Sequence, residues 1–133
     1  MTRDRRADRP AERHRSSDDA GQAAVEFAVA LPLIVVAMLA IAQVGVSIRH
    51  EIAVELAARE GARAAAVSAD SAGSASAAAR RAVALPMEVT VSSDGNAVSV
   101  TVTYVDPTDI AIIGAAIGPV THTATATMAI EPP

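Results

Sequence analysis

The apolar positions divide the chain into a polar head, a long apolar run and a helical extension. Residues 1–20 are charged and show no apolar periodicity, so we expect them to be disordered. Residues 27–48 are 22 positions without a formal charge. At about 1.5 Å per helical residue they cover roughly the 30 Å hydrocarbon core of a bilayer. Residues 49–67 are rich in helix formers, so the pattern predicts one long helix that begins near Gly21 or Gln22 and continues beyond the membrane.

Proline and polarity mark further boundaries along this helix. Pro32 lies inside the apolar run, where it removes one backbone hydrogen bond and favours a kink. The predicted organisation is a cytoplasmic leader at residues 1–21, a transmembrane helix at 22–48, an exposed helical region at 49–86, and a small β region at 87–133.

The hydrophobic period changes in the second half of the chain. Residues 68–76 are small and polar and favour a linker, and residues 77–85 favour a short second helix. Residues 87–92 and 98–104 then alternate between apolar and polar side chains, which is typical of half-buried strands. The intervening Ser93-Asp94-Gly95-Asn96 is a hairpin turn signal.

A third alternating stretch closes the chain. Residues 107–118 favour a loop with about one helical turn, and residues 120–130 favour a strand whose even-numbered apolar side chains lie on the helix. On the first two strands the covered face is expected to consist of valines, namely Val89, Val91, Val98, Val100 and Val102. The fold class is therefore α+β and membrane-anchored, a long N-terminal helix followed by an antiparallel sheet of about three strands.

Composition narrows the classes of function. The hydrophobic fraction is 51%, but 32 residues are alanine and Phe27 and Tyr104 are the only aromatic rings. Residues 22–133 carry five arginines against ten acidic residues. An acidic chain with almost no aromatic rings is poorly suited to binding nucleic acid, which requires a basic surface and stacking rings. The absence of cysteine excludes disulfides and thiolate chemistry.

Glu26 is the main candidate functional residue. A carboxylate at the edge of a membrane segment is costly unless it stays at the interface or finds a cation. On a helix Glu26 faces back towards Gln22, four residues earlier. Cleavage after Gly21 would place a new α-ammonium on Gln22, within reach of that carboxylate. The alternative is a carboxylate at the headgroup level, favoured by the positive end of the helix dipole.

The segment Gly21-Gln22-Ala23-Ala24-Val25-Glu26-Phe27 resembles a prepilin cleavage site, a glycine followed five residues later by glutamate and then an aromatic residue. Together with Leu31-Pro32 and the stretch Ala57-Ala58-Arg59-Glu60-Gly61-Ala62-Arg63-Ala64-Ala65-Ala66, it resembles the TadE family. These are minor pilin-like (pseudopilin) proteins of the tight-adherence, or Flp, pilus machinery.

The resemblance implies a structural subunit without a cofactor and without enzymatic activity. A prepilin peptidase would remove residues 1–21, and the mature protein would stay in the cell membrane or enter a surface pilus. Its N-terminus would be cytoplasmic and its C-terminal part outside. Its partners would be the major Flp-type pilin, other pseudopilins, the membrane platform of the Tad secretion system and membrane lipid.

Two other interpretations fit the same residues. Ala40-Ile41-Ala42 has the small-x-small form that signal peptidase accepts, which would make a secreted protein that begins near Gln43. The second interpretation is an uncleaved single-pass protein with a ligand-binding outer domain. Gln43 itself either bonds across helices or, as we expect, lies near the outer interface.

Few other residues suggest chemistry. Phe27, Arg59 and Arg63 are possible partner contacts, although a pair of arginines one turn apart is more often a solvated helix face. Glu55 and Arg59 are expected to pair at i, i+4. His14, His50 and His122 lie in three separate regions without metal-ligand spacing, so the sequence predicts no metal site.

Overall fold

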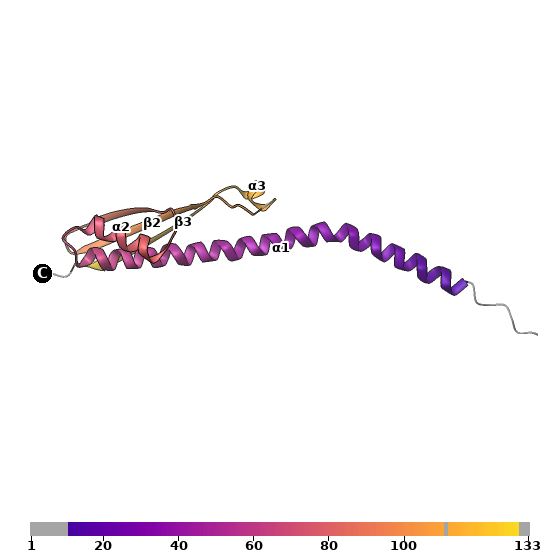
Figure 1. Ribbon diagram of the computed structural model, residues 1–133. Helices are drawn as coiled ribbons and strands as arrows, with labels where there is room; N and C mark the ends of the chain where they lie inside the picture. The colour runs from indigo at the N-terminus through magenta and orange to yellow at the C-terminus, as the bar shows by residue number, and fades with distance from the viewer. Residues whose placement is uncertain (1–10, 111, 131–133) are drawn as a thin grey trace, which may run out of the picture. The chain divides into compact units, whose positions relative to one another are not determined.

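The computed structural model describes residues 11–110 and 112–130, with side-chain surroundings from residue 19 onward. The chain divides into two compact units, Met1–Met38 and Leu39–Pro133. The longest element is α1 (Ala11–Ala66), which begins in the first unit and ends in the second (Figure 1).

The start of α1 differs from the expected one. The helix begins at Ala11, whereas the sequence favoured a start near Gly21 or Gln22 and disorder before it. Alanine, glutamate and arginine in residues 11–20 are good helix formers, and extending an existing helix is far easier than nucleating one. The helix therefore takes in the described part of the predicted leader, and residues 1–10 lie outside the described residues. Pro32 is inside α1, which stays helical on both sides of it, and the kink remains a prediction.

The end of α1 agrees with the sequence to within one residue, but the second helix does not. α2 (Ser71–Ala82) begins six residues before the expected start at Ala77. The cause is Asp70, whose Oδ1 accepts a hydrogen bond from the Gly73 amide at 3.0 Å and caps the helix. The expected linker is therefore shortened to the few residues before Ser71.

The C-terminal part forms the predicted three-stranded antiparallel sheet. Its order is β1 (Glu88–Ser93), β2 (Ala97–Asp106) and β3 (Val120–Ala129), with β2 in the centre. The expected hairpin turn joins β1 to β2, where the Asp94 carboxylate accepts hydrogen bonds from the amides of Asn96 and Ala97. The short helix α3 (Ile113–Ile117) lies in the connection between β2 and β3, as the sequence predicted.

The core lies between the sheet, the C-terminal part of α1 and α2 (Figure 1). The predicted valine face is confirmed: alternate residues of β2 are buried, and the valines of β1 and the even-numbered apolar residues of β3 pack against them. The helices contribute small side chains. The buried residues of α1 and α2 are Val54, Ala57, Ala58, Ala62, Ala65, Ala66, Ala75, Ala78 and Ala79.

The opposite face of the sheet is polar and consists largely of hydroxyl groups. Between β2 and β3 these pair across the strands, with oxygen–oxygen distances of 2.7 Å for Ser99–Thr127 and 2.8 Å for Thr101–Thr125. Alternation along each strand therefore separates an apolar inner face from a hydroxyl-rich outer face.

Candidate functional site

The residues around the predicted cleavage point lie on the surface of α1. A Cβ added at Gly21 would meet no atom within 4 Å. The Gln22 side-chain amide donates a hydrogen bond to Glu26 Oε1 at 3.1 Å. The carboxylate thus reaches residue 22, as the i, i+4 spacing predicted. The helix places Gly21, Gln22 and Glu26 together, and Phe27 follows with its ring exposed.

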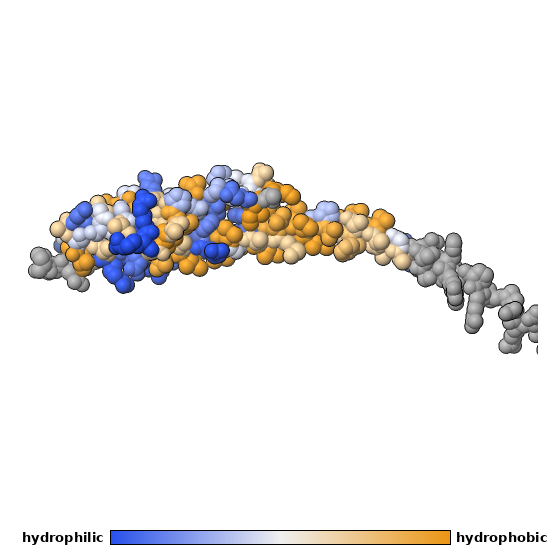
Figure 2. Space-filling view, in the orientation of Figure 1, coloured by the Kyte–Doolittle hydropathy of each residue, from blue (hydrophilic) through white to orange (hydrophobic). Residues whose placement is uncertain are grey.

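An apolar surface follows this segment. The 18-residue window that marks α1 as long and apolar enough to cross a membrane has none of its residues buried within the protein. Figure 2 shows the surface of this stretch in the colour of hydrophobic residues. Its exposed large side chains are Val25, Phe27, Val29, Leu31, Leu33, Ile34, Val35, Met38, Ile41, Val44 and Ile48. A continuous apolar surface of this kind marks contact with lipid or with other proteins.

The two arginines further along α1 differ in their contacts. Arg59 donates a hydrogen bond to Glu55 Oε2 at 3.0 Å, which confirms the predicted i, i+4 pair. Both groups are well exposed, so the pair adds little to stability. Arg63 is also exposed. Their role as partner contacts stays a prediction.

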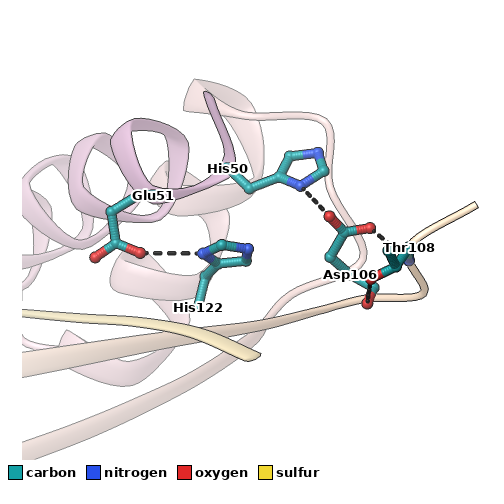
Figure 3. Close-up of polar contacts among 5 residues, drawn as sticks. All are labelled: His50, Glu51, Asp106, Thr108 and His122. Carbon is teal, nitrogen blue, oxygen red and sulfur yellow. Dashed lines mark hydrogen bonds and ion pairs between the residues drawn. The ribbon is translucent and has the colours of Figure 1, made fainter. Parts of the chain in front are cut away.

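A second group of polar residues lies in the unit Leu39–Pro133 and brings three elements together. His50 comes from α1, and Asp106 is the last residue of β2. His50 Nδ1 and Asp106 Oδ2 are 2.9 Å apart. The other carboxylate oxygen, Asp106 Oδ1, accepts a hydrogen bond from the Thr108 amide at 3.0 Å, which fixes the orientation of the carboxylate (Figure 3).

His122, from β3, completes this group. Its Nδ1 lies 3.1 Å from Glu51 Oε2 on α1. Its Nε2 is buried and has no hydrogen-bond partner among the described residues. Figure 3 shows this nitrogen on the edge of the ring turned away from Glu51, towards His50 and Asp106. One potential ligand atom from each of His50, Asp106 and His122 lies within 4.8 Å of the other two.

Tyr104 packs against this group. Its ring meets that of His50 edge-on, with ring centroids 4.9 Å apart, and stacks with that of His122 at 6.4 Å. Burial raises the pKa of the Tyr104 hydroxyl, and the carboxylates of Asp106 and Asp109 raise it further. The Tyr104 side chain therefore stays uncharged and packs against the two imidazole rings.

The expectation that the histidines are too scattered for a metal site is wrong for His50 and His122, whose ring centroids are 5.7 Å apart. The strand register explains why: Tyr104 pairs with His122 across β2 and β3, and Asp106 lies on the same face of β2 as the core valines. Residues 104, 106 and 122 have even numbers, like the inward-facing valines of β2, so the alternation along the strands could have placed them on the inner face of the sheet. Their proximity to His50 could not be predicted in this way, because it depends on where along α1 the sheet packs. The side-chain surroundings of His14 lie outside the described residues.

Gln43 is a further buried polar residue. Its side chain is 5% exposed, and neither amide atom has a partner among the described residues. The structure buries this residue within the unit Leu39–Pro133, and its expected place near the outer interface stays a prediction.

Comparison with known protein families gives one match. Residues 21–63 match the family model described as TadE-like protein, and this range contains both the Gly21–Phe27 segment and the arginine pair. Neither the curated proteins nor the solved structures contain a match. The match confirms the resemblance drawn from the sequence over residues 21–63, which are similar to the TadE-like family.

Proposed function

We propose that the protein is a structural subunit of Tad (Flp-type) pilus assembly, a pseudopilin that is cut after Gly21 and held in the cell membrane by residues 22–48. The observation that carries the proposal is the unburied apolar surface of α1 directly after the Gly21–Phe27 segment. Because water solvates such a surface poorly, lipid or neighbouring apolar helices are its natural surroundings.

The geometry of Glu26 supports a role in assembly. Its carboxylate already bonds to the Gln22 side chain. After cleavage the α-ammonium of Gln22 would lie on the same residue, so Glu26 would have a positive partner in its own chain or in a neighbouring one. A charge pair is worth most where water is scarce, as in a bundle of apolar helices. The carboxylate would therefore favour assembled, correctly aligned subunits.

In this proposal the protein acts without a cofactor and without catalysis. The cut is made by a prepilin peptidase on the cytoplasmic side, and the region after Ile48 lies outside. Helix packing in the membrane joins the subunit to the major pilin, to other pseudopilins and to the membrane platform of the system. Small residues of the apolar run, such as Ala37 and Gly45, allow close helix approach.

The mature N-terminus tests the proposal. We expect intact-mass measurement of membrane-extracted protein to give a chain that begins at Gln22. Gly21→Leu should keep the uncut mass, because the added side chain has free space and blocks only the protease. Gly45→Leu is the matched control, since a Cβ at Gly45 also meets nothing within 4 Å, and it should be cut normally. A species that begins near Gln43, or one that keeps the original start, would overturn the proposal.

The role of Glu26 requires a separate measurement. We expect Glu26→Gln to be inserted and cut normally but to be recovered poorly with the other pilus subunits after cross-linking in membranes. Glu55→Gln removes an exposed carboxylate from the same helix and should assemble normally. Equal recovery of the Glu26→Gln and Glu55→Gln variants would contradict the charge-pair role.

A further inference from the structure

We propose that His50, Asp106 and His122 form a binding site for a divalent transition-metal ion of the Zn²⁺ class. The inference is independent of pilus assembly, because all three residues lie in the unit Leu39–Pro133 and outside the Gly21–Phe27 segment. The three side chains come from α1, β2 and β3, and Figure 3 shows them converging.

The unpartnered nitrogen of His122 is the observation that points to a ligand. His122 is 4% exposed, and its Nε2 has no hydrogen-bond partner among the described residues. A buried polar atom without a partner is destabilising, so such atoms are rare unless something binds them. The nitrogen faces the His50–Asp106 pair, and a metal ion between these groups would satisfy it.

The distances suit metal coordination after a small adjustment. Ligand atoms about 2.0–2.1 Å from a tetrahedral ion lie roughly 3.3 Å from one another. His50 Nδ1 and Asp106 Oδ2, at 2.9 Å, are already near this separation. The longest separation in the cluster is at most 4.8 Å, and rotation of the imidazoles about their side-chain bonds shortens it. Three protein ligands leave one position for water.

The surrounding groups are those that orient metal ligands. Glu51 Oε2 lies 3.1 Å from His122 Nδ1, so it accepts a hydrogen bond from the protonated Nδ1 and leaves Nε2 free to bind metal. The Thr108 amide occupies Asp106 Oδ1 and leaves Oδ2 for the ion. Each of these two ligands is therefore held by a neighbour that does not itself bind the ion.

The ligand types select the class of metal. Two imidazoles and one carboxylate suit Zn²⁺ and its first-row neighbours, whereas Ca²⁺ and Mg²⁺ prefer oxygen ligands throughout. The bound ion would join α1 to the end of β2 and to the start of β3. His50 comes two residues after the end of the apolar run, so the site would brace the outer region where it follows the membrane helix.

The test is metal binding by the untagged full chain in detergent micelles, freed of metal by a chelator. We expect one Zn²⁺ per chain by calorimetry, and a visible absorption band of a low-symmetry site when Co²⁺ is used instead. His50→Ala and His122→Ala should each abolish the Co²⁺ band. Glu51→Gln should weaken Zn²⁺ affinity about 10- to 100-fold, because it removes the group that orients His122.

Two matched controls separate this site from general metal binding. His14→Ala removes the third histidine, and Glu55→Gln removes a carboxylate one turn along α1 from Glu51; both should bind Zn²⁺ like the unchanged chain. Near-UV circular dichroism of Tyr104 reports whether each variant is folded, and Asp106→Asn provides a ligand variant of unchanged shape if a histidine variant unfolds. A chain that binds no Zn²⁺, or binds it equally well in the folded His122→Ala or Asp106→Asn variant, would overturn the proposal.

Discussion

At Gly61, α1 approaches both β2 and α2 closely. A Cβ added there would lie 3.1 Å from Val100 Cγ1 on β2 and 3.3 Å from the Ala75 carbonyl oxygen on α2. Val100 is fully buried, and the Ala75 oxygen belongs to a helix backbone, so neither has free space to move into. The absence of a side chain at Gly61 therefore permits the close contact of α1 with β2 and α2.

These distances predict effects of different size on the free energy of unfolding for a small and a large substitution at Gly61. Gly61→Ala gains about 1 kcal/mol in helix propensity, and its tight contacts offset much of that gain. Gly61→Leu adds three more carbon atoms at the same place, and overpacking of this kind costs about 1–3 kcal/mol. Gly45 is the control, because a Cβ there meets nothing within 4 Å, so Gly45→Ala keeps the whole gain of about 1 kcal/mol.

The single tyrosine provides the assay. Tyr104 belongs to the core, and the chain has no tryptophan, so tyrosine fluorescence and near-UV circular dichroism follow unfolding of the unit Leu39–Pro133. For a region of this size we expect Gly61→Leu to lower Tm on the order of 10 °C in micelles. If Gly61→Leu melted at the temperature of Gly45→Leu, the close approach of α1 to β2 and α2 would be refuted.

Three further changes test separate features of the unit Leu39–Pro133. Gln43→Met replaces a buried amide that has no partner among the described residues by a side chain of similar shape. We therefore expect the free energy of unfolding, measured by chemical denaturation, to rise by about 1 kcal/mol, and a decrease would show that the amide is hydrogen-bonded. Asp70→Ala removes the cap of α2 and should cost about 1 kcal/mol in the same measurement, while Asp109→Ala should not. At the hairpin, backbone hydrogen bonds from Ala97 and Asn96 hold the pKa of Asp94 below its usual 3.8. The ionised Asp94 therefore stabilises the fold fully above pH 3.8, and this stabilisation is lost as the pH falls through the lowered pKa. Asp94→Asn should remove this part of the decrease of Tm in acid.

Periodicity was enough to predict the main elements from the sequence. Alternation along the valine-rich strands gave the sheet, its hairpin and its covered face, because each of these depends on neighbouring residues alone. The exposed apolar surface of α1 was also predictable, because it follows directly from the run of uncharged residues at 27–48. The Gln22–Glu26 contact follows from helix spacing, so it too was predictable.

Errors arose where structure depends on context. The start of α1 at Ala11 results from extension of the long helix into residues 11–20, a segment too short to form a stable helix by itself. The start of α2 depends on one capping side chain, Asp70, which lay within a stretch of linker composition. The His50–Asp106–His122 group requires knowledge of which turn of α1 faces which end of the sheet, and no local pattern contains that information.

The composition of the core explains why further contacts would stabilise the unit Leu39–Pro133. Its largest fully buried side chains are the valines Val54, Val98, Val100 and Val102, and the helices contribute mainly alanine. Alanine lets α1 and α2 approach closely and loses no side-chain entropy, but each methyl group buries little apolar area. A small domain with such a core has a narrow margin of stability. An ion that joins α1, β2 and β3 would add restraint where the alanine-rich packing provides least, and neighbouring helices would do the same for the apolar surface of α1. In the proposed assembly, the stability of this unit would depend on lipid, neighbouring helices and bound metal, because its own alanine-rich core buries little apolar area.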